Sequence, residues 1–297
     1  MAQILDGREV SAAIKEQLKR EVSAMVDQGL RPPHLVAILV GNDGGSMTYV
    51  SAKEKACHEI GFLGSVIRYE NTVTEQELLN KIDEINRNDQ IDGLIVQLPL
   101  PKHIDENRVT LAIAPHKDVD GFHDVNMGRL AKGADGVKPA TPYGITLILK
   151  HYGITTEGKH VVVVGRSNIV GRPMSIMLSG PGETGNATVT VTHSKTKDLA
   201  SWTRSADIIV AAIGRPGFIT GDMVKPGAVV IDVGTTRVDD DSKKAGWRLS
   251  GDVDFASVEP VAGAITPVPG GVGPMTIAGL LANTMLARKA QIHAQTA

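Results

Sequence analysis

Short apolar runs alternate with helical segments along this chain of 297 residues, and this alternation limits the possible folds more than any other feature. The runs are rich in valine and isoleucine, as strands buried in a parallel sheet are. They lie at residues 34–41, 65–69, 91–101, 161–164, 187–194, 206–214 and 228–234. Between them lie helical patterns such as residues 7–27, where apolar side chains recur every three or four positions. The alternation predicts an α/β fold built on parallel sheets.

Charge and cysteine content exclude several classes of protein. The 31 basic and 33 acidic residues nearly cancel, so no overall field favours a nucleic acid or an anionic membrane as a partner. The single Cys57 cannot form an internal disulfide, and the first residues carry no apolar signal core. No apolar run reaches the length that spans a membrane. We therefore expect a cytoplasmic protein with neither nucleic acid nor membrane as a partner.

We expect two domains and a final helix that returns to the first of them. The pair Thr141-Pro142 marks the N-cap and first turn of a helix, and we place the domain boundary beside it. Residues 1–139 then form an α/β domain that binds substrate, and residues 140–279 form a Rossmann-like domain. The final helix begins near Thr276, and its residues 280–297 are expected to pack on the first domain. Its expected apolar stripe contains Leu280, Leu281, Met285 and Leu286.

One predicted helix carries two candidate functional side chains. Ser46 is its expected N-cap and Gly61 its expected stop, because glycine readily takes a left-handed conformation. Tyr49 and Lys53 lie four positions apart, so the phenol and the amine share one face. The helix follows the strand at 34–41 through a glycine turn, near the sheet edge where α/β folds bind ligands. The alternative is an ordinary half-buried tyrosine beside a solvated lysine.

Two further polar candidates stand in loops. Gln97 lies where an apolar run meets Pro99, which cannot continue a central strand, so its amide is expected to project from a strand end. The loop at 115–122 offers Asp118 and Asp120 beside a glycine. In both places the alternative reading is a side chain that only stabilises a turn.

A strand of four valines runs into a glycine turn and then a helix, which is the arrangement that holds a pyrophosphate. The turn reads Gly165-x-Ser167-x-x-x-Gly171 and departs from GxGxxG. After the next strand, His193 and Ser194 stand where an NAD enzyme would carry an acid for the ribose hydroxyls. With no carboxylate to repel a 2′-phosphate and Arg166 in the turn, the sequence predicts NADP in preference to NAD.

Several segments together resemble the bifunctional methylenetetrahydrofolate dehydrogenase/cyclohydrolase family. They are VQLPLP at 96–101, KDVDGF at 117–122, KPATPYG at 138–144, VVVGRSNIVGRP at 162–173 and TPVPGGVGPMT at 266–276. They follow one another in the family's order over essentially the whole chain. After the strand at 228–234 this chain has Thr235-Thr236-Arg237 where the family often has isoleucine and asparagine, and its loop at 179–186 is longer than usual.

The resemblance implies a role for each candidate residue. The implied catalytic residues are Lys53, Tyr49, Gln97 and Asp120. The implied substrate contacts are Tyr49, Gln97, Leu98, Pro99, Asp120, Pro269, Gly270, Gly271 and Val272. The implied cofactor contacts are Gly165, Arg166, Ser167, His193, Ser194, Ile213, Gly214 and Thr235. A homodimer and a place in one-carbon metabolism and purine biosynthesis are implied in the same way.

The implied reaction has two steps at one carbon. Hydride leaves the bridge of methylenetetrahydrofolate for the nicotinamide of NADP, and water then adds to the methenyl cation to give formyltetrahydrofolate. Lys53 is the candidate base, because the nearby cation and a partly desolvated site both lower the pKa of an amine. Gln97 would hold this amine by a hydrogen bond, Tyr49 would stack on the folate, and Asp120 would bind the amino-pyrimidine edge of the pterin.

Other readings remain. A shikimate-type two-domain NADP dehydrogenase shares the expected architecture, and a nucleotide-binding protein without catalysis would need the glycine turn but neither Lys53 nor Gln97. The order of the glycine turn and the Tyr49/Lys53 pair is reversed relative to short-chain dehydrogenases, which excludes that family. Cys57-His58-Glu59 are adjacent on a helix and point to different faces, so we expect no metal site there.

Overall fold

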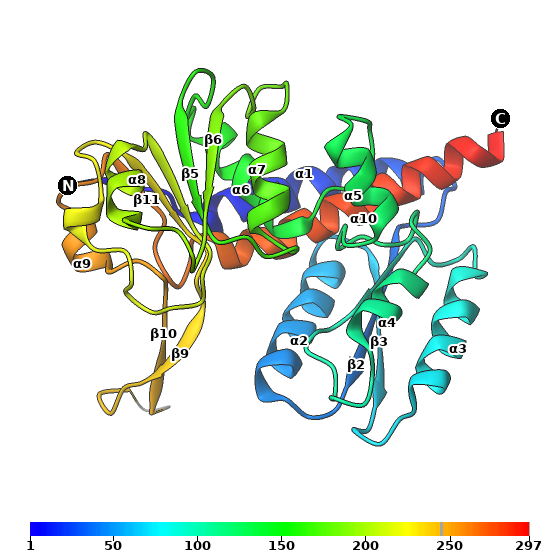
Figure 1. The fold of residues 1–297 in the computed structure, drawn as a ribbon. Helices are drawn as coiled ribbons and strands as arrows, with labels where there is room; N and C mark the ends of the chain where they lie inside the picture. The colour runs from blue at the N-terminus through cyan, green and yellow to red at the C-terminus, as the bar shows by residue number, and fades with distance from the viewer. Residues whose placement is uncertain (244–245, 297) are drawn as a thin grey trace. The chain divides into compact units, whose positions relative to one another are not determined.

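The structure, a computed structural model, describes residues 1–243 and 246–296, which form two compact units. The larger-sheet unit consists of Met1–Ala12 and Thr141–Thr276, and the smaller-sheet unit consists of residues 13–140 and those from 277 on (Figure 1). Every strand pair within the two main sheets is parallel. The predicted α/β class and the two-domain organisation are therefore confirmed.

The smaller-sheet unit is built on three parallel strands in the order β3-β2-β4. The strands are β2 (His34–Val40), β3 (Leu63–Tyr69) and β4 (Gly93–Val96), and the helices are α2 (Gly44–Glu59), α3 (Glu75–Asn86), α4 (Glu106–Ala112) and α5 (Asp124–Ala131). The unit also contains residues 13–27 of α1 (Gly7–Asp27) and the residues from 277 on of α10 (Val272–Thr296). Side chains of the central strand β2 alternate between two apolar clusters. Leu35, Ala37 and Leu39 pack with α1, α2 and α10, whereas Val36, Ile38 and Val40 pack with α3 and α4. Burial on both faces explains why this run is apolar without interruption.

Helix α2 begins earlier than the sequence suggested. Its N-cap is Asp43, whose Oδ2 accepts a hydrogen bond from the backbone N–H of Ser46 at 2.8 Å. Ser46 was expected to be the cap, and this prediction is wrong, because Ser46 lies inside the helix and a carboxylate holds its N–H against the positive helix end. The predicted stop is confirmed, since Gly61 has φ +85°.

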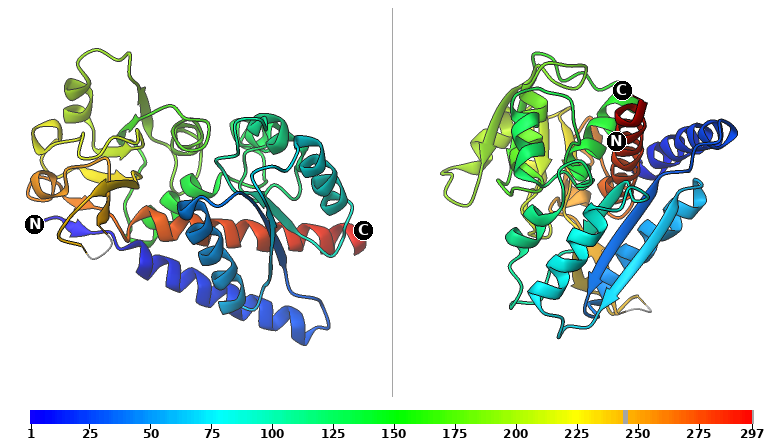
Figure 2. Two further views of the ribbon diagram at one scale, coloured as in Figure 1. Left: turned by 90° about the horizontal axis from the view of Figure 1, so that it is seen from below. Right: turned by 90° about the vertical axis from the view of Figure 1, so that its right-hand side faces the viewer.

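The final helix α10 returns to the smaller-sheet unit, as predicted. Asn283 donates from Nδ2 to the carbonyls of Val119 at 2.8 Å and Lys138 at 2.7 Å, and Lys289 pairs with Glu21 of α1 at 2.7 Å. The last part of α1 and α10 accordingly lie side by side (Figure 2).

The apolar stripe of α10 differs from the prediction at one position. Leu280, Leu281 and Met285 are buried, but the Leu286 side chain is 45% exposed. Five residues after Leu281 the helix has turned about 140° from it, so Leu286 points away from the core. The helix also starts at Val272, before the expected Thr276.

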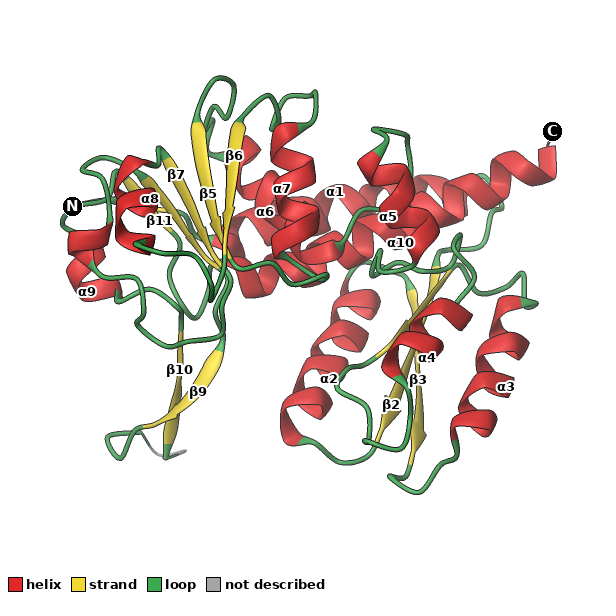
Figure 3. Cartoon of the chain, in the orientation of Figure 1, coloured by secondary structure: helices red, strands yellow, loops and turns green. Residues whose placement is uncertain are grey.

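The larger-sheet unit contains six parallel strands in the order β1-β11-β8-β7-β5-β6. They are β1 (Gln3–Ile4), β5 (His160–Val164), β6 (Thr188–Thr192), β7 (Ile208–Ala211), β8 (Val229–Asp232) and β11 (Ala264–Ile265). Helices α6 (Ala140–His151) and α7 (Gly171–Ser179) lie on one side of this sheet, and α8 (Leu199–Ser205) and α9 (Phe255–Val258) on the other (Figure 3). Helix α6 starts at Ala140, so Thr141 is inside it and is not its N-cap.

Two features of this unit were not expected. An antiparallel hairpin of β9 (Thr236–Asp239) and β10 (Trp247–Ser250) follows β8. The first residues of the chain also join this sheet, since Gln3 N–H donates to the carbonyl of Gly263 and Leu5 N–H to that of Ile265, both at 2.9 Å. Residues 1–12 therefore belong with the larger sheet and not with the rest of residues 1–139.

Candidate active site and nucleotide turn

Three of the predicted catalytic residues meet in the smaller-sheet unit. Lys53 is on α2 and only 5% exposed, and its Nζ donates to Oε1 of Gln97 at 3.1 Å. Gln97 follows β4 directly and is fixed twice, because its N–H donates to the Ile38 carbonyl at 2.9 Å and its Nε2 to the Leu98 carbonyl at 2.7 Å. Lys53 Nζ also lies 5.2 Å from the ring centroid of Tyr49. The shared helix face predicted for Tyr49 and Lys53 is thus present, and Lys53 is not a solvated surface lysine.

Asp120 is held by its backbone. Its carbonyl accepts the N–H of Ala140 at 3.1 Å. Gly121 follows with φ +77°, and a Cβ there would lie 2.6 Å from the backbone nitrogen of Pro139 and 2.7 Å from the carbonyl carbon of Lys138. Only glycine fits this close approach of two backbone segments. The loop that carries Asp120 is therefore fixed by backbone contacts with residues 138–140.

Burial and mutual attraction act in opposite directions on Lys53 and Asp120. Burial lowers the pKa of Lys53 from its ordinary value, and the carboxylate of Asp120 partly offsets this decrease. Burial raises the pKa of Asp120, and the Lys53 ammonium partly offsets that increase. The net direction favours the neutral form of each group, so a neutral amine is accessible here at a lower pH than for an exposed lysine.

Leu98 and Pro99 continue from Gln97 and are joined by a cis peptide bond. Leu98 is partly buried against the apolar cluster that covers β4, whereas Pro99 is exposed. The remaining predicted substrate contacts, Pro269 to Val272, lie at the junction of β11 and α10. Gly271 is tightly packed there, since a Cβ would lie 2.6 Å from the Pro267 carbonyl oxygen.

The predicted nucleotide turn joins β5 to α7 in the larger-sheet unit. Gly165 has φ +126°, and a Cβ there would lie 2.2 Å from the carbonyl oxygen of Ala212. A Cβ on Gly171 would lie 2.2 Å from the Gly165 carbonyl oxygen, so the start of α7 packs directly on the turn. Oγ of Ser167 accepts the N–H groups of Val170 at 3.2 Å and Gly171 at 3.3 Å. A hydroxyl group that accepts two bonds can still donate its own proton to a ligand. This turn has the close backbone packing and the helix start that a pyrophosphate requires.

The other predicted cofactor contacts lie in loops of the same unit. His193 and Ser194 follow β6, and His193 Nδ1 is 3.2 Å from the N–H of Lys195. Ile213 and Gly214 follow β7, and Thr235 is exposed between β8 and β9. The strands are parallel, so the loops after β5, β6, β7 and β8 share one edge of the sheet.

Two buried carboxylates that accept hydrogen bonds from these loops were not predicted from the sequence. Asp232 ends β8, and Asp252 follows β10. Burial raises the pKa of Asp232 to about 6, although backbone N–H groups partly offset this increase. Neither residue belongs to a spacing pattern that identifies a site, because their partners come from distant parts of the chain.

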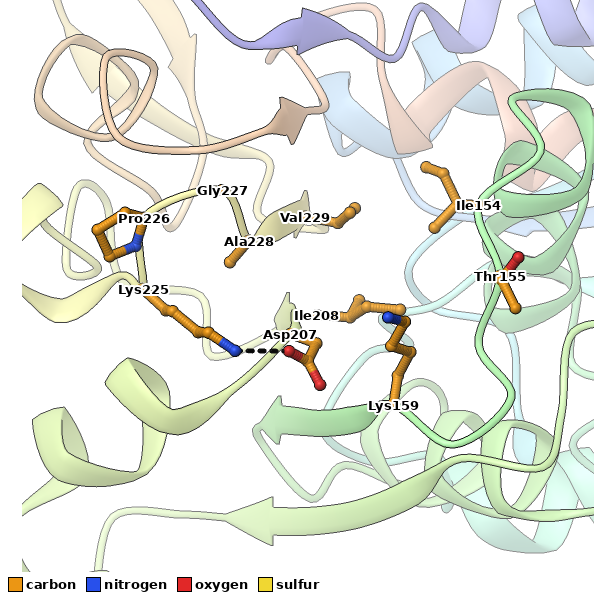
Figure 4. Close-up of a pocket in the computed structure, with 10 residues that line it drawn as sticks. All are labelled: Ile154, Thr155, Lys159, Asp207, Ile208, Lys225, Pro226, Gly227, Ala228 and Val229. Carbon is orange, nitrogen blue, oxygen red and sulfur yellow. Dashed lines mark hydrogen bonds and ion pairs between the residues drawn. The ribbon is translucent and has the colours of Figure 1, made fainter.

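A surface hollow of about 390 Å³ lies at the opposite edge of the larger sheet (Figure 4). It is lined by residues at the amino ends of β5, β7 and β8, including Lys159, Ile208 and Val229. Lys225 and Asp207 form an ion pair of 2.7 Å in it. The glycine turn lies at the other ends of these strands, so this hollow is not the nucleotide site.

Cys57 belongs to the apolar core, whereas His58 and Glu59 are exposed, so the three side chains do not converge. Burial raises the pKa of Cys57 to about 12. Within residues 1–243 and 246–296 no group of three His, Cys, Asp or Glu side chains could hold a metal ion. In the same part of the chain no helix is both long and apolar enough to cross a membrane.

Comparison with known proteins agrees with this geometry. The protein-family model for the tetrahydrofolate dehydrogenase/cyclohydrolase catalytic domain matches residues 5–120. The family model for the NAD(P)-binding domain of the same enzymes matches residues 139–292. A bifunctional protein FolD from Flavobacterium johnsoniae is 57% identical, with 97% of each chain covered.

Solved structures show the same similarity. FolD from Campylobacter jejuni, a methylenetetrahydrofolate dehydrogenase/cyclohydrolase, is 46% identical with a TM-score of 0.91, covering 98% of this chain and 99% of that one. The Trypanosoma brucei enzyme, solved with NADP and an inhibitor, is 40% identical with a TM-score of 0.92, covering 98% of each chain. A shikimate dehydrogenase from Thermus thermophilus is only 16% identical with a TM-score of 0.50 and shares the fold alone. The resemblance seen in the sequence is confirmed, and the chain belongs to the tetrahydrofolate dehydrogenase/cyclohydrolase family.

Proposed function

We propose that this chain oxidises methylenetetrahydrofolate to methenyltetrahydrofolate with NADP and hydrolyses the product to formyltetrahydrofolate. The observation that supports this most is the buried Lys53 amine, hydrogen-bonded to Gln97 at 3.1 Å beside Tyr49 and Asp120. A nucleotide-binding protein without catalysis would not need a buried, amide-held lysine. A shikimate dehydrogenase is disfavoured because the shikimate dehydrogenase compared above is only 16% identical to this chain.

In the hydrolytic step Lys53 is the general base. The oxygen of water forms a bond to the methenyl carbon, and the neutral amine takes the proton that this water loses. The hydroxyl group formed on that carbon then loses its proton as the bond between the carbon and one of its two nitrogens breaks. This nitrogen receives a proton, and the formyl group stays on the other nitrogen. Gln97 holds Nζ without adding a negative charge, which would raise the pKa of the amine.

Substrate binding falls to Tyr49 and Asp120 in this proposal. The Tyr49 ring lies beside Lys53 and offers a flat surface for the folate. The Asp120 carboxylate suits the row of N–H donors on the amino-pyrimidine edge of a pterin. Leu98, Pro99 and the 269–272 loop are proposed to complete the folate contacts.

The glycine turn is proposed to hold the pyrophosphate of NADP, with Arg166 near the 2′-phosphate and no carboxylate at the end of β6 to repel it. The NADP in the Trypanosoma brucei structure supports this choice of nucleotide. NADP, when bound, supplies the acceptor of the hydride.

Arg166→Ala should reduce the preference for NADP over NAD, measured as the ratio of the two kcat/KM values. Equal use of both nucleotides by the unmodified protein would contradict the choice.

The hydrolytic role is tested with Lys53→Met. The apolar, unbranched methionine side chain fills most of the site but cannot accept a proton, so hydrolysis of methenyltetrahydrofolate should fall by about a hundredfold or more. The affinity for NADP should stay unchanged. Lys55→Met, on the same helix with an exposed side chain, is the matched control and should keep both activities. Hydrolysis retained in the Lys53 variant would overturn the assignment.

We also propose a cytosolic homodimer. The one cysteine is a buried free thiol, as suits a reducing compartment. The dimer is proposed from the family resemblance, and light scattering of the purified protein measures it directly.

A further inference from the structure

The larger-sheet unit contains two buried carboxylates that the proposed chemistry does not use. Asp252 is 0% and Asp232 is 4% exposed. Among the described residues neither forms an ion pair, and their oxygens are satisfied by backbone N–H groups instead. Such an arrangement is costly unless every oxygen is hydrogen-bonded, so its geometry is tightly defined.

Asp252 binds the loop that follows β7. Its Oδ2 accepts the N–H groups of Ile213 at 2.6 Å and Gly214 at 3.0 Å, and its Oδ1 accepts that of Arg215 at 2.7 Å. Three consecutive N–H groups thus converge on one carboxylate. Gly214 has φ +66°, the left-handed conformation that brings the N–H groups to the same side.

Asp232 in turn fixes Asp252. Its Oδ1 accepts the N–H groups of Asp252 at 2.8 Å and Gly234 at 2.9 Å, and its Oδ2 accepts that of Val253 at 3.0 Å. The N–H of Asp232 donates to Oγ1 of Thr266 at 2.8 Å. The loops after β7 and β8 are therefore tied together through two side chains.

These loops lie at the sheet edge that carries the glycine turn. Strand β7 pairs with β5, and the Ala212 N–H donates to the Val164 carbonyl at 2.8 Å, immediately before Gly165. Strand β6 lies on the other side of β5. In a Rossmann-like sheet the pyrophosphate lies across the central turn, so the two halves of a dinucleotide extend toward opposite neighbours. In that arrangement the loop after the next strand along the chain from the glycine turn, here β6, faces the adenosine ribose, which leaves the nicotinamide half to the loops after β7 and β8.

We propose that Asp252, supported by Asp232, is a positioning residue that fixes the Ile213–Arg215 loop for the nicotinamide half of the dinucleotide. This inference rests on the proposed function. In this proposal neither carboxylate contacts the substrate. Their effect is to set the shape of a loop that the nicotinamide contacts during hydride transfer.

The test uses Asp252→Asn in the full chain. An amide has the same shape but only one acceptor oxygen, so at least one N–H of the loop loses its partner. We expect the dehydrogenase kcat to fall by about tenfold to a hundredfold, because a loop displaced by about 1 Å misplaces the reacting carbon. Hydrolysis of methenyltetrahydrofolate, assayed without nucleotide, should stay unchanged.

Two nucleotide affinities separate positioning from a general loss of structure. The variant should bind NADP more weakly, by about tenfold, and should bind 2′-phosphoadenosine 5′-diphosphate, which lacks nicotinamide, as the unmodified protein does. Asp254→Asn, two positions away with a side chain that does not cap α9, is the matched control and should change nothing. An equal loss for both nucleotides, or a parallel fall in hydrolysis, would overturn the proposal.

A second variant covers the case in which Asp252→Asn does not fold. Gly214→Ala strains the loop backbone at φ +66° but adds a methyl group that meets nothing within 4 Å. It should produce the same selective loss of dehydrogenase activity and NADP affinity, and an unchanged NADP affinity would count against the proposal. If the unmodified protein has no dehydrogenase activity, the proposed function fails, whereas the two nucleotide affinities still test the role of Asp252.

Discussion

At the scale of single residues, burial and one neighbouring carboxylate act on the pKa of Lys53, the proposed base. An amine that is 5% exposed is poorly solvated as an ammonium, and burial lowers its pKa. The carboxylate of Asp120 opposes this decrease, so the protonation of Lys53 depends on a neighbour as well as on burial. The pKa of the lysine proposed as the base thus depends on a residue proposed to bind substrate.

Replacing Asp120 with asparagine tests this coupling. The substitution removes the negative charge that raises the pKa of Lys53, so this pKa should fall further. A base acts when unprotonated, and the rate of hydrolysis rises as the pH passes through its pKa. The rising limb of the pH–rate profile should therefore move to lower pH in Asp120→Asn, while KM for the folate increases.

The control for this variant is Asp124→Asn, an exposed position at the start of α5. Its profile should coincide with that of the unmodified enzyme. A shift of the Asp120→Asn profile to higher pH would show that the two groups are not coupled as described.

Residue-scale predictions from sequence succeeded where a helix repeat or the end of an apolar strand fixes the position of the residue. The spacing of Tyr49 and Lys53 on one helix is fixed by helical geometry, and the position of Gln97 follows from the end of a short apolar run. Asp252 could not be found in this way. Its partners are 37 to 39 positions away in sequence, and only the folded sheet brings them together.

At the scale of elements, helix starts were the least predictable feature. Both α2 and α6 begin before the residue chosen as cap. Several polar residues near a helix start can each accept an N–H bond, and tertiary packing selects among them. In α2 the choice matters because this helix carries Tyr49 and Lys53.

The cap of α2 can be tested by substitution. Asp43→Ala should lower the free energy of unfolding by about 1 kcal/mol, since the N–H of Ser46 loses its carboxylate partner. Asp43→Asn keeps an acceptor oxygen and is the conservative control. Ser46→Ala should leave the cap bond in place, because Ser46 contributes only its backbone N–H to this bond. Urea unfolding followed by circular dichroism measures the free energy of unfolding of all three variants. A larger decrease for Ser46→Ala than for Asp43→Ala would indicate that Ser46 is the N-cap after all.

Strands were predicted well where they are apolar and poorly where they are short or polar. The strands β2, β5, β7 and β8 coincide with valine- and isoleucine-rich runs. The hairpin strands β9 and β10 both contain charged residues and lack a continuous apolar run. Strands β1 and β11 have only two residues each. Nothing in their local sequence separates them from loops.

At the scale of the whole molecule, each unit is assembled from separate parts of the chain. The sequence indicated one crossing near residue 139, and the chain does pass between units after Ala140. It did not indicate the crossing after Ala12, because β1 is defined only by its pairing with β11.

The contribution of α10 to the smaller-sheet unit can be measured with two leucines of the same helix. Leu281 is fully buried, and Leu281→Ala should reduce the free energy of unfolding by about 2–5 kcal/mol through the cavity it leaves. Leu286→Ala removes the same atoms from an exposed position and should change it by less than about 0.5 kcal/mol. Comparable losses in the two variants would mean that the helix is rotated from the orientation described.

The interleaving of chain segments sets the order in which the molecule can be completed during translation. Strand β11 stands between β1 and β8 in the sheet, and the last helix supplies Leu280, Leu281 and Met285 to the other core. A nascent chain therefore leaves the ribosome with two unfinished cores. The larger sheet is completed when β11 is synthesised, and the smaller-sheet unit only when α10 follows. A stop codon ahead of β11 would consequently leave both units incomplete, whereas one in the part of α10 after Thr276 would leave only the smaller-sheet unit incomplete.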